Sequence, residues 1–85
     1  MSKKQKLLAK VLAGTGNVRF ADVVKLAETF GFTLARVNGS HHIFAHPQLA
    51  ELLNLQRHGS KAKPYQIRQL LALVEEYNLT FGDAR

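Results

Sequence analysis

The sequence contains no cysteine, which excludes disulfide bonds and thiolate metal ligands. It also lacks a long apolar run, since its apolar stretches are a few residues long and a membrane helix needs about 20. The lysines near the N-terminus are not followed by an apolar signal core. We therefore expect a cytoplasmic protein that makes no contact with a membrane.

Acidic residues are scarce, with 6 Asp and Glu against 12 Lys and Arg, for a net charge of +6. Such a balance favours an anionic partner such as nucleic acid. The scarcity is strongest in the middle of the chain, where Glu51 is the single acid between Thr29 and Val74. The paired carboxylates of glycoside chemistry are missing, and so are the glycine patterns that bind nucleotide phosphates.

The 85 residues, 46% of them hydrophobic, are enough for one domain with a modest core. Apolar residues recur at helical spacing in three segments, which predicts helices over residues 1–12, 21–30 and 64–77. Phe20 is expected to pack as a staple just before the second helix, and Gly31 to end it. Pro64 suits the first position of the third helix.

Between the second and third helices, β-forming residues predict strands over 32–37, 41–45 and 52–56, although 49–55 also fits a short helix. Simple alternation in the first strand places Leu34 and Val37 on opposite faces. Asn38-Gly39 predicts a tight hairpin turn. Residues 57–63 are interpreted as a basic loop and 80–85 as a loose tail.

These elements predict an α+β fold, in which a leading helix is followed by α-β-β-β-α with a three-stranded antiparallel sheet. Two helices hide one face of such a sheet and leave the other face open to a ligand. The expected organisation is an N-terminal helical extension over 1–16, a domain over 17–79 and a tail over 80–85.

Three of the four histidines, His41, His42 and His46, fall within six residues. Neighbours on a strand point to opposite faces, and an extended chain separates His42 from His46 by roughly 13 Å. That distance is too long for two ligands of one zinc ion, so we expect no metal site. The serines beside histidines have no orienting carboxylate nearby in the sequence, which leaves a hydrolytic triad without support.

Acid–base catalysis by a histidine among cations remains compatible with these residues. RNA carries its own nucleophile, the 2′-hydroxyl, so cleavage needs a base and cations to hold the phosphate, and no cofactor. The candidate RNA-binding residues are Arg36, Ser40, His58, Lys61, Lys63 and Arg68. A structural role for any one of these histidines is the competing interpretation. Composition by itself predicts a basic domain that binds RNA or DNA.

The order of motifs resembles a known family. The segment Gly39-Ser40-His41-His42-Ile43-Phe44-Ala45-His46-Pro47 after a helix, followed by Leu53-Asn54-Leu55 and Lys63-Pro64-Tyr65-Gln66-Ile67-Arg68, is similar to the HicA-type (YcfA-like) toxins. The likeness covers roughly residues 20–79. It implies a fold like that of double-stranded-RNA-binding domains, and the function of an mRNA interferase: a metal-independent endoribonuclease, a hydrolase of RNA phosphodiester bonds.

The same resemblance implies that a cognate HicB-type antitoxin blocks the site. The catalytic histidine of the family follows Gly-Ser, which corresponds to His41 here. Two alternatives remain open from the sequence. One is a non-catalytic RNA-binding module of the same fold, and the other is a domain whose basic face recognises an acidic protein.

Overall fold

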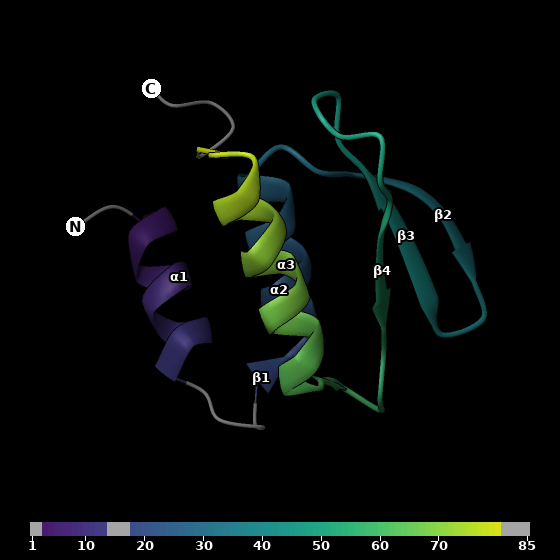
Figure 1. The fold of residues 1–85 in the computed structure, drawn as a ribbon. Coiled ribbons are helices and arrows are strands. Elements are labelled where there is room, and N and C mark those ends of the chain that lie inside the picture. Colours follow the sequence, from purple (N-terminus) through teal and green to yellow (C-terminus); the bar gives the residue numbers. More distant parts are fainter. Residues whose placement is uncertain (1–2, 14–17, 81–85) are drawn as a thin grey trace.

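The computed structural model describes residues 3–13 and 18–80 (Figure 1). Its elements are α1 (Lys3–Ala13), β1 (Val18–Arg19), α2 (Phe20–Thr29), β2 (Thr33–Asn38), β3 (His41–Ala45), β4 (Leu53–Gln56), β5 (Lys61–Ala62) and α3 (Pro64–Glu76). The predicted α+β fold is confirmed, including the order α-β-β-β-α from α2 to α3. The predicted break at 14–17 and the tail after Thr80 lie outside the described residues.

The larger sheet has the strand order β2-β3-β4, with both pairs antiparallel. The third predicted strand is therefore confirmed, and the alternative of a helix over 49–55 is wrong. His42 and Phe44 of β3 lie opposite Leu55 and Leu53 of β4, and these four side chains face the helices. The face that carries His41, Ile43, Asn54 and Gln56 is called the open face below.

The hairpin turn lies one residue later than predicted. Asn38 pairs with His41, so the two loop residues are Gly39 and Ser40. Gly39 has φ +63, a conformation that glycine adopts without strain and that tight hairpins need at their first loop position. Glycine thus decides the position of the turn, and Asn38 remains in the strand.

Strand β2 does not alternate in the simple way that its sequence suggests. Its register against β3 shifts between Leu34 and Arg36, so that Leu34 pairs with Phe44 and Val37 with His42. A bulge of this kind adds one residue and returns both apolar side chains to the face that the helices cover. The two remain 48% and 52% exposed because β2 is an edge strand.

The core lies between the helices and the sheet (Figure 1). It contains fully buried side chains of α2, the sheet and α3: Val23, Leu26, Phe44, Leu53, Leu55 and Leu70. Gly31, with φ +98, ends α2 as predicted, and Pro64 begins α3. Phe20 differs from the prediction, because it is the buried first residue of α2 rather than the residue before it.

The predicted basic loop contains a short strand. Val18 and Arg19 of β1 pair with Ala62 and Lys61 of β5, and the backbone N–H of Phe20 donates to the carbonyl of Ser60 over 2.9 Å. Helix α2 follows β1 directly, and α3 begins two residues after β5. The small ladder therefore holds the first turns of both helices together (Figure 1).

Helix α1 packs against α2 (Figure 1). Its Val11 is 1% exposed, and the ammonium of Lys10 lies 3.1 Å from Asp22 Oδ2 in the first turn of α2. Within the part of the chain that the structure describes, no helix has the length and apolar character needed to cross a membrane.

Candidate functional site

His41 is the first residue of β3 and lies on the open face. Its side chain is half-buried, and its Nδ1 is 3.2 Å from Oδ1 of Asn54 on β4. The tight turn at Gly39 and Ser40 precedes it, and the N–H of Arg57 donates to the carbonyl of Ser40 over 2.9 Å. His41 is therefore held at a corner of the sheet where two chain segments meet.

His42 points to the other face of the sheet, as the alternation of a strand requires. Its ring packs edge-on against Phe20 of α2, with ring centroids 4.9 Å apart. Its Nδ1 lies 3.3 Å from the carbonyl oxygen of Ser40. The two adjacent histidines consequently occupy different environments and do not act on one ligand together.

His46 belongs to the core, with 9% of its surface exposed. Its Nε2 lies 2.9 Å from the carbonyl oxygen of Phe30, and its Nδ1 accepts the backbone N–H of Gln48 at 3.1 Å. A carbonyl can only accept, so Nε2 carries the proton of a neutral ring. His46 ties the end of α2 to the segment after β3, and both ring nitrogens are used in doing so.

His58 lies in a tight turn in which His58 and Lys61 exchange two backbone hydrogen bonds of 3.0 Å. Gly59 takes φ +62 there, and the Nε of Arg57 donates to the Gly59 carbonyl over 2.7 Å. The Nε2 of His58 is buried without a hydrogen-bond partner. In this turn the side chains of Arg57 and Lys61 are therefore more exposed to solvent than the imidazole of His58.

The predicted cations come from two parts of the fold. Arg36 is exposed on the open face, opposite Ile43 and close along the ladder to His41. Ser40, Lys61 and Lys63 are exposed in the turn and around β5, and Arg68 is exposed on α3. We call the hairpin turn 39–40, residues 57–63 and Arg19 the basic end of the molecule.

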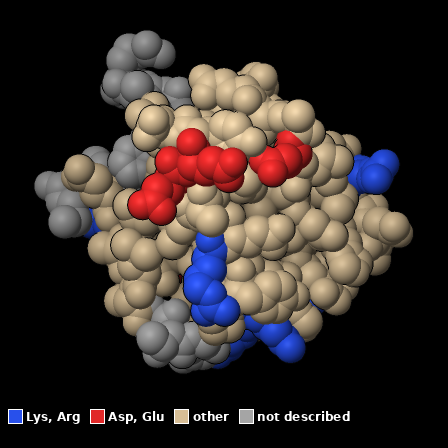
Figure 2. Space-filling model, in the orientation of Figure 1, with Lys and Arg blue, Asp and Glu red and all other residues tan. Residues whose placement is uncertain are grey.

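The first turns of α2 and α3 also lie at the basic end, next to the β1–β5 ladder. The unpaired N–H groups at a helix start carry partial positive charge, which adds to the field of the lysines and arginines. Glu51, Glu75 and Glu76 lie elsewhere, the last two at the far end of α3. Figure 2 shows the acidic side chains of this face close together in its upper half, with basic side chains in the centre and at the bottom and one more at the right edge.

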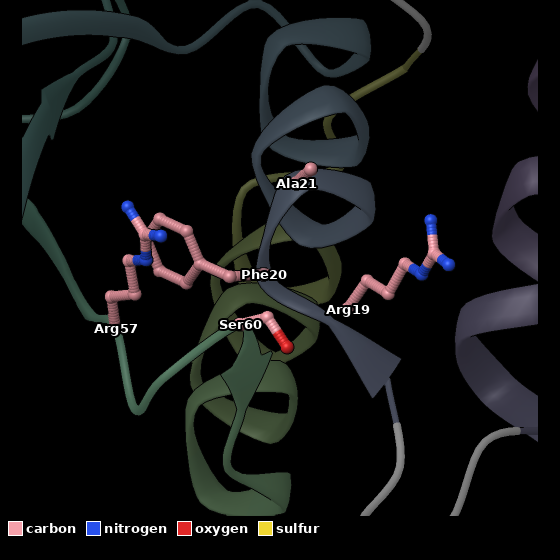
Figure 3. Close-up of a pocket in the computed structure, with 5 residues that line it drawn as sticks. All are labelled: Arg19, Phe20, Ala21, Arg57 and Ser60. Atoms are coloured by element: carbon pink, nitrogen blue, oxygen red, sulfur yellow. The ribbon is translucent and has the colours of Figure 1, made fainter.

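A pocket of about 390 Å³ opens at the basic end, lined by Arg19, Phe20, Ala21, Arg57 and Ser60. In Figure 3 the side chains of Arg57 and Arg19 extend to opposite sides of Phe20 and Ser60. The two guanidinium groups therefore do not converge on one point. Separated cations of this kind suit a chain of phosphates better than a single small anion.

Three residues near these groups are not among the site residues that the sequence predicted. Arg19 and Arg57 belong to the site because they line the pocket, and Asn54 belongs to it because it contacts His41. Arg57 was visible in the sequence as one cation of the basic loop, and Asn54 as part of the Leu53-Asn54-Leu55 motif, but neither pattern assigns the residue a role. In residues 3–13 and 18–80, no group of three or more His, Asp or Glu side chains is clustered as metal ligands would be.

The sequence profile of one protein family matches the chain. Its description reads HicA toxin of bacterial toxin–antitoxin, and the match covers residues 20–75, from the start of α2 almost to the end of α3. The comparison with curated proteins gives no match. Because more than half of the chain matches, including both helices and the whole sheet of the site, this protein belongs to the HicA toxin family of bacterial toxin–antitoxin systems.

Proposed function

We propose that this protein is an mRNA interferase that cleaves RNA without a metal ion and uses His41 as its acid–base group. The observation that carries the proposal is the position of His41, on the open face at the corner where the sheet meets the basic end. Family membership supplies the setting, a toxin paired with a cognate antitoxin.

An RNA backbone fits the charges that surround this corner. Arg36 lies on the open face, while Arg57, Lys61 and Lys63 follow the edge below it. No acidic residue occurs between Glu51 and Val74. Cations spread along an edge neutralise successive phosphates and release their counterions. Within the described ranges, the side chain of Arg57 donates through Nε to the Gly59 carbonyl, which leaves its Nη groups for this role.

The reaction follows from the chemistry of RNA. His41 removes the proton of a 2′-hydroxyl, whose oxygen then attacks the adjacent phosphorus while the bond from phosphorus to the 5′-oxygen breaks. The products are a 2′,3′-cyclic phosphate and a 5′-hydroxyl, because the leaving 5′-oxygen takes a proton from water and the protonated His41 returns its proton to the solvent. The cations of the site stabilise the additional negative charge of the pentacovalent transition state.

His41 suits this role better than the other three histidines. His46 uses both ring nitrogens inside the core, and His42 faces Phe20 under the sheet. The Nε2 of His58 is buried. The Nε2 of His41 has no partner among the described residues, and the open face gives a bound RNA strand access to it.

The proposed inhibitor is a HicB-type antitoxin that covers the open face and the basic end. Acidic groups on such a partner would complement the charge of this region and speed its capture. Binding there places the inhibitor directly over His41.

The test uses the full chain, freed of any bound inhibitor, with labelled RNA in the presence of a chelator. We expect His41→Ala to lose cleavage by roughly 10²- to 10⁴-fold, the usual contribution of an acid–base group. His42→Ala and His58→Ala serve as controls, and a substrate with a 2′-deoxy sugar at the cut site should resist cleavage. Addition of the antitoxin should stop the reaction.

Undiminished cleavage by a folded His41→Ala protein, or efficient cleavage of the deoxy substrate, would contradict the mechanism. An inert wild-type protein that still binds RNA would instead favour the non-catalytic RNA-binding module.

A further inference from the structure

Asn54 lies beside His41 on the open face. The register of β3 and β4 pairs Asn54 with Ile43 and His41 with Gln56, so Asn54 is the diagonal neighbour of His41. Diagonal neighbours on one face of an antiparallel pair are within reach of long side chains. Here the contact joins Asn54 Oδ1 to His41 Nδ1 over 3.2 Å.

We infer that Asn54 is a positioning residue that keeps the proton of neutral His41 on Nδ1 and leaves the lone pair on Nε2. This inference rests on the proposed function. An amide oxygen can only accept, so the contact is a hydrogen bond when Nδ1 carries the proton. The other ring nitrogen, Nε2, then exchanges a proton with the RNA.

The same hydrogen bond serves both protonation states of the ring. When Nε2 takes up the proton of the 2′-hydroxyl, Nδ1 still donates to Asn54, and the imidazolium keeps its orientation. A neutral amide achieves this without a negative charge, which would repel the phosphate beside it. Both partners lie on paired strands, so the backbone ladder fixes their spacing.

The neighbouring amide does not perform this role. Gln56 lies directly opposite His41, but its Nε2 points to the hydroxyl of Ser40, at 3.5 Å. Within the described part of the chain, Asn54 is therefore the side chain that contacts the imidazole of His41 by a polar group.

The experiment compares two substitutions of this exposed residue. Asn54→Leu has a similar size and cannot accept a hydrogen bond, while Asn54→Asp keeps the acceptor and adds a negative charge. We expect Asn54→Leu to lower kcat about tenfold with KM changed less than about twofold, because a hydrogen bond that orients the base is lost and the RNA contacts remain. Gln69→Leu, at an exposed position of α3, is the control and should leave both constants unchanged.

Asn54→Asp tests the pH profile of kcat, which would not change if Asn54 had only a structural role. A carboxylate next to the ring favours the imidazolium form of His41 over the neutral form. The base must be deprotonated to act, so the acid limb of the pH profile of kcat should move to higher pH. Long-range ¹H–¹⁵N spectra of the free protein should show the Nδ1–H tautomer in the wild type and a mixture of tautomers in Asn54→Leu.

The outcomes separate the two hypotheses. If His41→Ala is inactive while Asn54→Leu keeps the wild-type kcat and tautomer, the positioning role is overturned and the proposed function stands. If His41→Ala cleaves as fast as the wild type, the proposed function fails and the positioning role fails with it.

Discussion

At the scale of single residues, the four histidines of this chain have four different environments. His41 lies on the open face, His42 packs against Phe20, His46 is bonded inside the core and His58 has a buried Nε2. Two of them are neighbours in the sequence, yet strand geometry separates their side chains completely. The histidine-rich segment therefore contains one candidate catalytic residue, His41, and histidines with structural roles.

Substitutions of His46 and Gly31 test the structural role of the buried His46 ring. We expect His46→Leu to destabilise the protein by roughly 2 to 4 kcal/mol, because the Phe30 carbonyl and the Gln48 N–H lose their partner. Gly31→Ala should also destabilise it, since a Cβ there would lie 2.8 Å from Nε2 of His46 at a φ of +98. Urea unfolding measures both changes.

The double variant Gly31→Ala/His46→Ala tests whether the two residues interact directly. In His46→Ala there is no imidazole ring close to the Cβ added at residue 31. The loss of unfolding free energy caused by Gly31→Ala should therefore be smaller in the His46→Ala background than in the wild type. Strictly additive free energies of unfolding would show that the close approach of Gly31 to His46 is unimportant. His41→Leu, on the open face, is the matched control and should change stability by about 0.5 kcal/mol or less.

At the scale of elements, α1 lies outside the region that the family match covers. The matched region begins at Phe20, and α1 ends at Ala13. The helix nevertheless contributes Val11 to the core and an ion pair from Lys10 to Asp22. Most of the stability of a helix this short comes from packing, so α1 is expected to depend on α2 for its structure.

A pair of substitutions tests whether α1 is part of the folded core. Val11→Ala should destabilise the protein by about 1 to 2 kcal/mol, because two buried methyl groups are lost and alanine favours the helix slightly. The neighbouring Leu12 is 57% exposed, so Leu12→Ala should change the free energy of unfolding by about 0.5 kcal/mol or less. Equal effects of the two substitutions in thermal unfolding would contradict the observed packing.

At the scale of the whole molecule, Glu51, Glu75 and Glu76 lie away from the basic end, while Asp22, in the first turn of α2, is paired with Lys10. The starts of α2 and α3 share one end with Lys61, Lys63 and the arginines of the pocket, and α3 ends in Glu75 and Glu76 (Figure 2). Near that other end, the hydroxyl of Tyr77 donates to Glu51 over 2.8 Å. This hydrogen bond, with burial and the charges of Glu51 and Glu76, raises the pKa of Tyr77. A polyanion should therefore approach from the basic end.

This polarity predicts how RNA affinity depends on salt. We expect a steep loss of affinity with rising salt, and Lys61→Ala/Lys63→Ala should reduce the slope by about one unit for each lost phosphate contact. Lys3→Ala/Lys6→Ala removes the same charge from exposed positions of α1 and should leave the slope nearly unchanged. Fluorescence anisotropy with a labelled RNA at several salt concentrations measures both. Identical slopes for the two double variants would show that net charge alone matters.

Local sequence patterns were enough to predict the helices, the three strands of the larger sheet and the resemblance to the family. Apolar spacing defined the helices, and glycine and proline marked their ends at Gly31 and Pro64. The Gly-Ser-His segment and its order relative to these elements gave the resemblance that the family match confirmed. These are local signals, because backbone geometry and helical or strand periodicity are properties of neighbouring residues.

The way in which distant segments meet could be seen only in the folded structure. The bulge in β2, the β1–β5 ladder and the contact of Asn54 with His41 all depend on the register between segments far apart in the sequence. A ladder of two residues has no periodicity to detect, and a one-residue shift between strands reverses which face a side chain occupies. For the same reason the environment of each histidine became known only when the sheet and its covering helices were placed together.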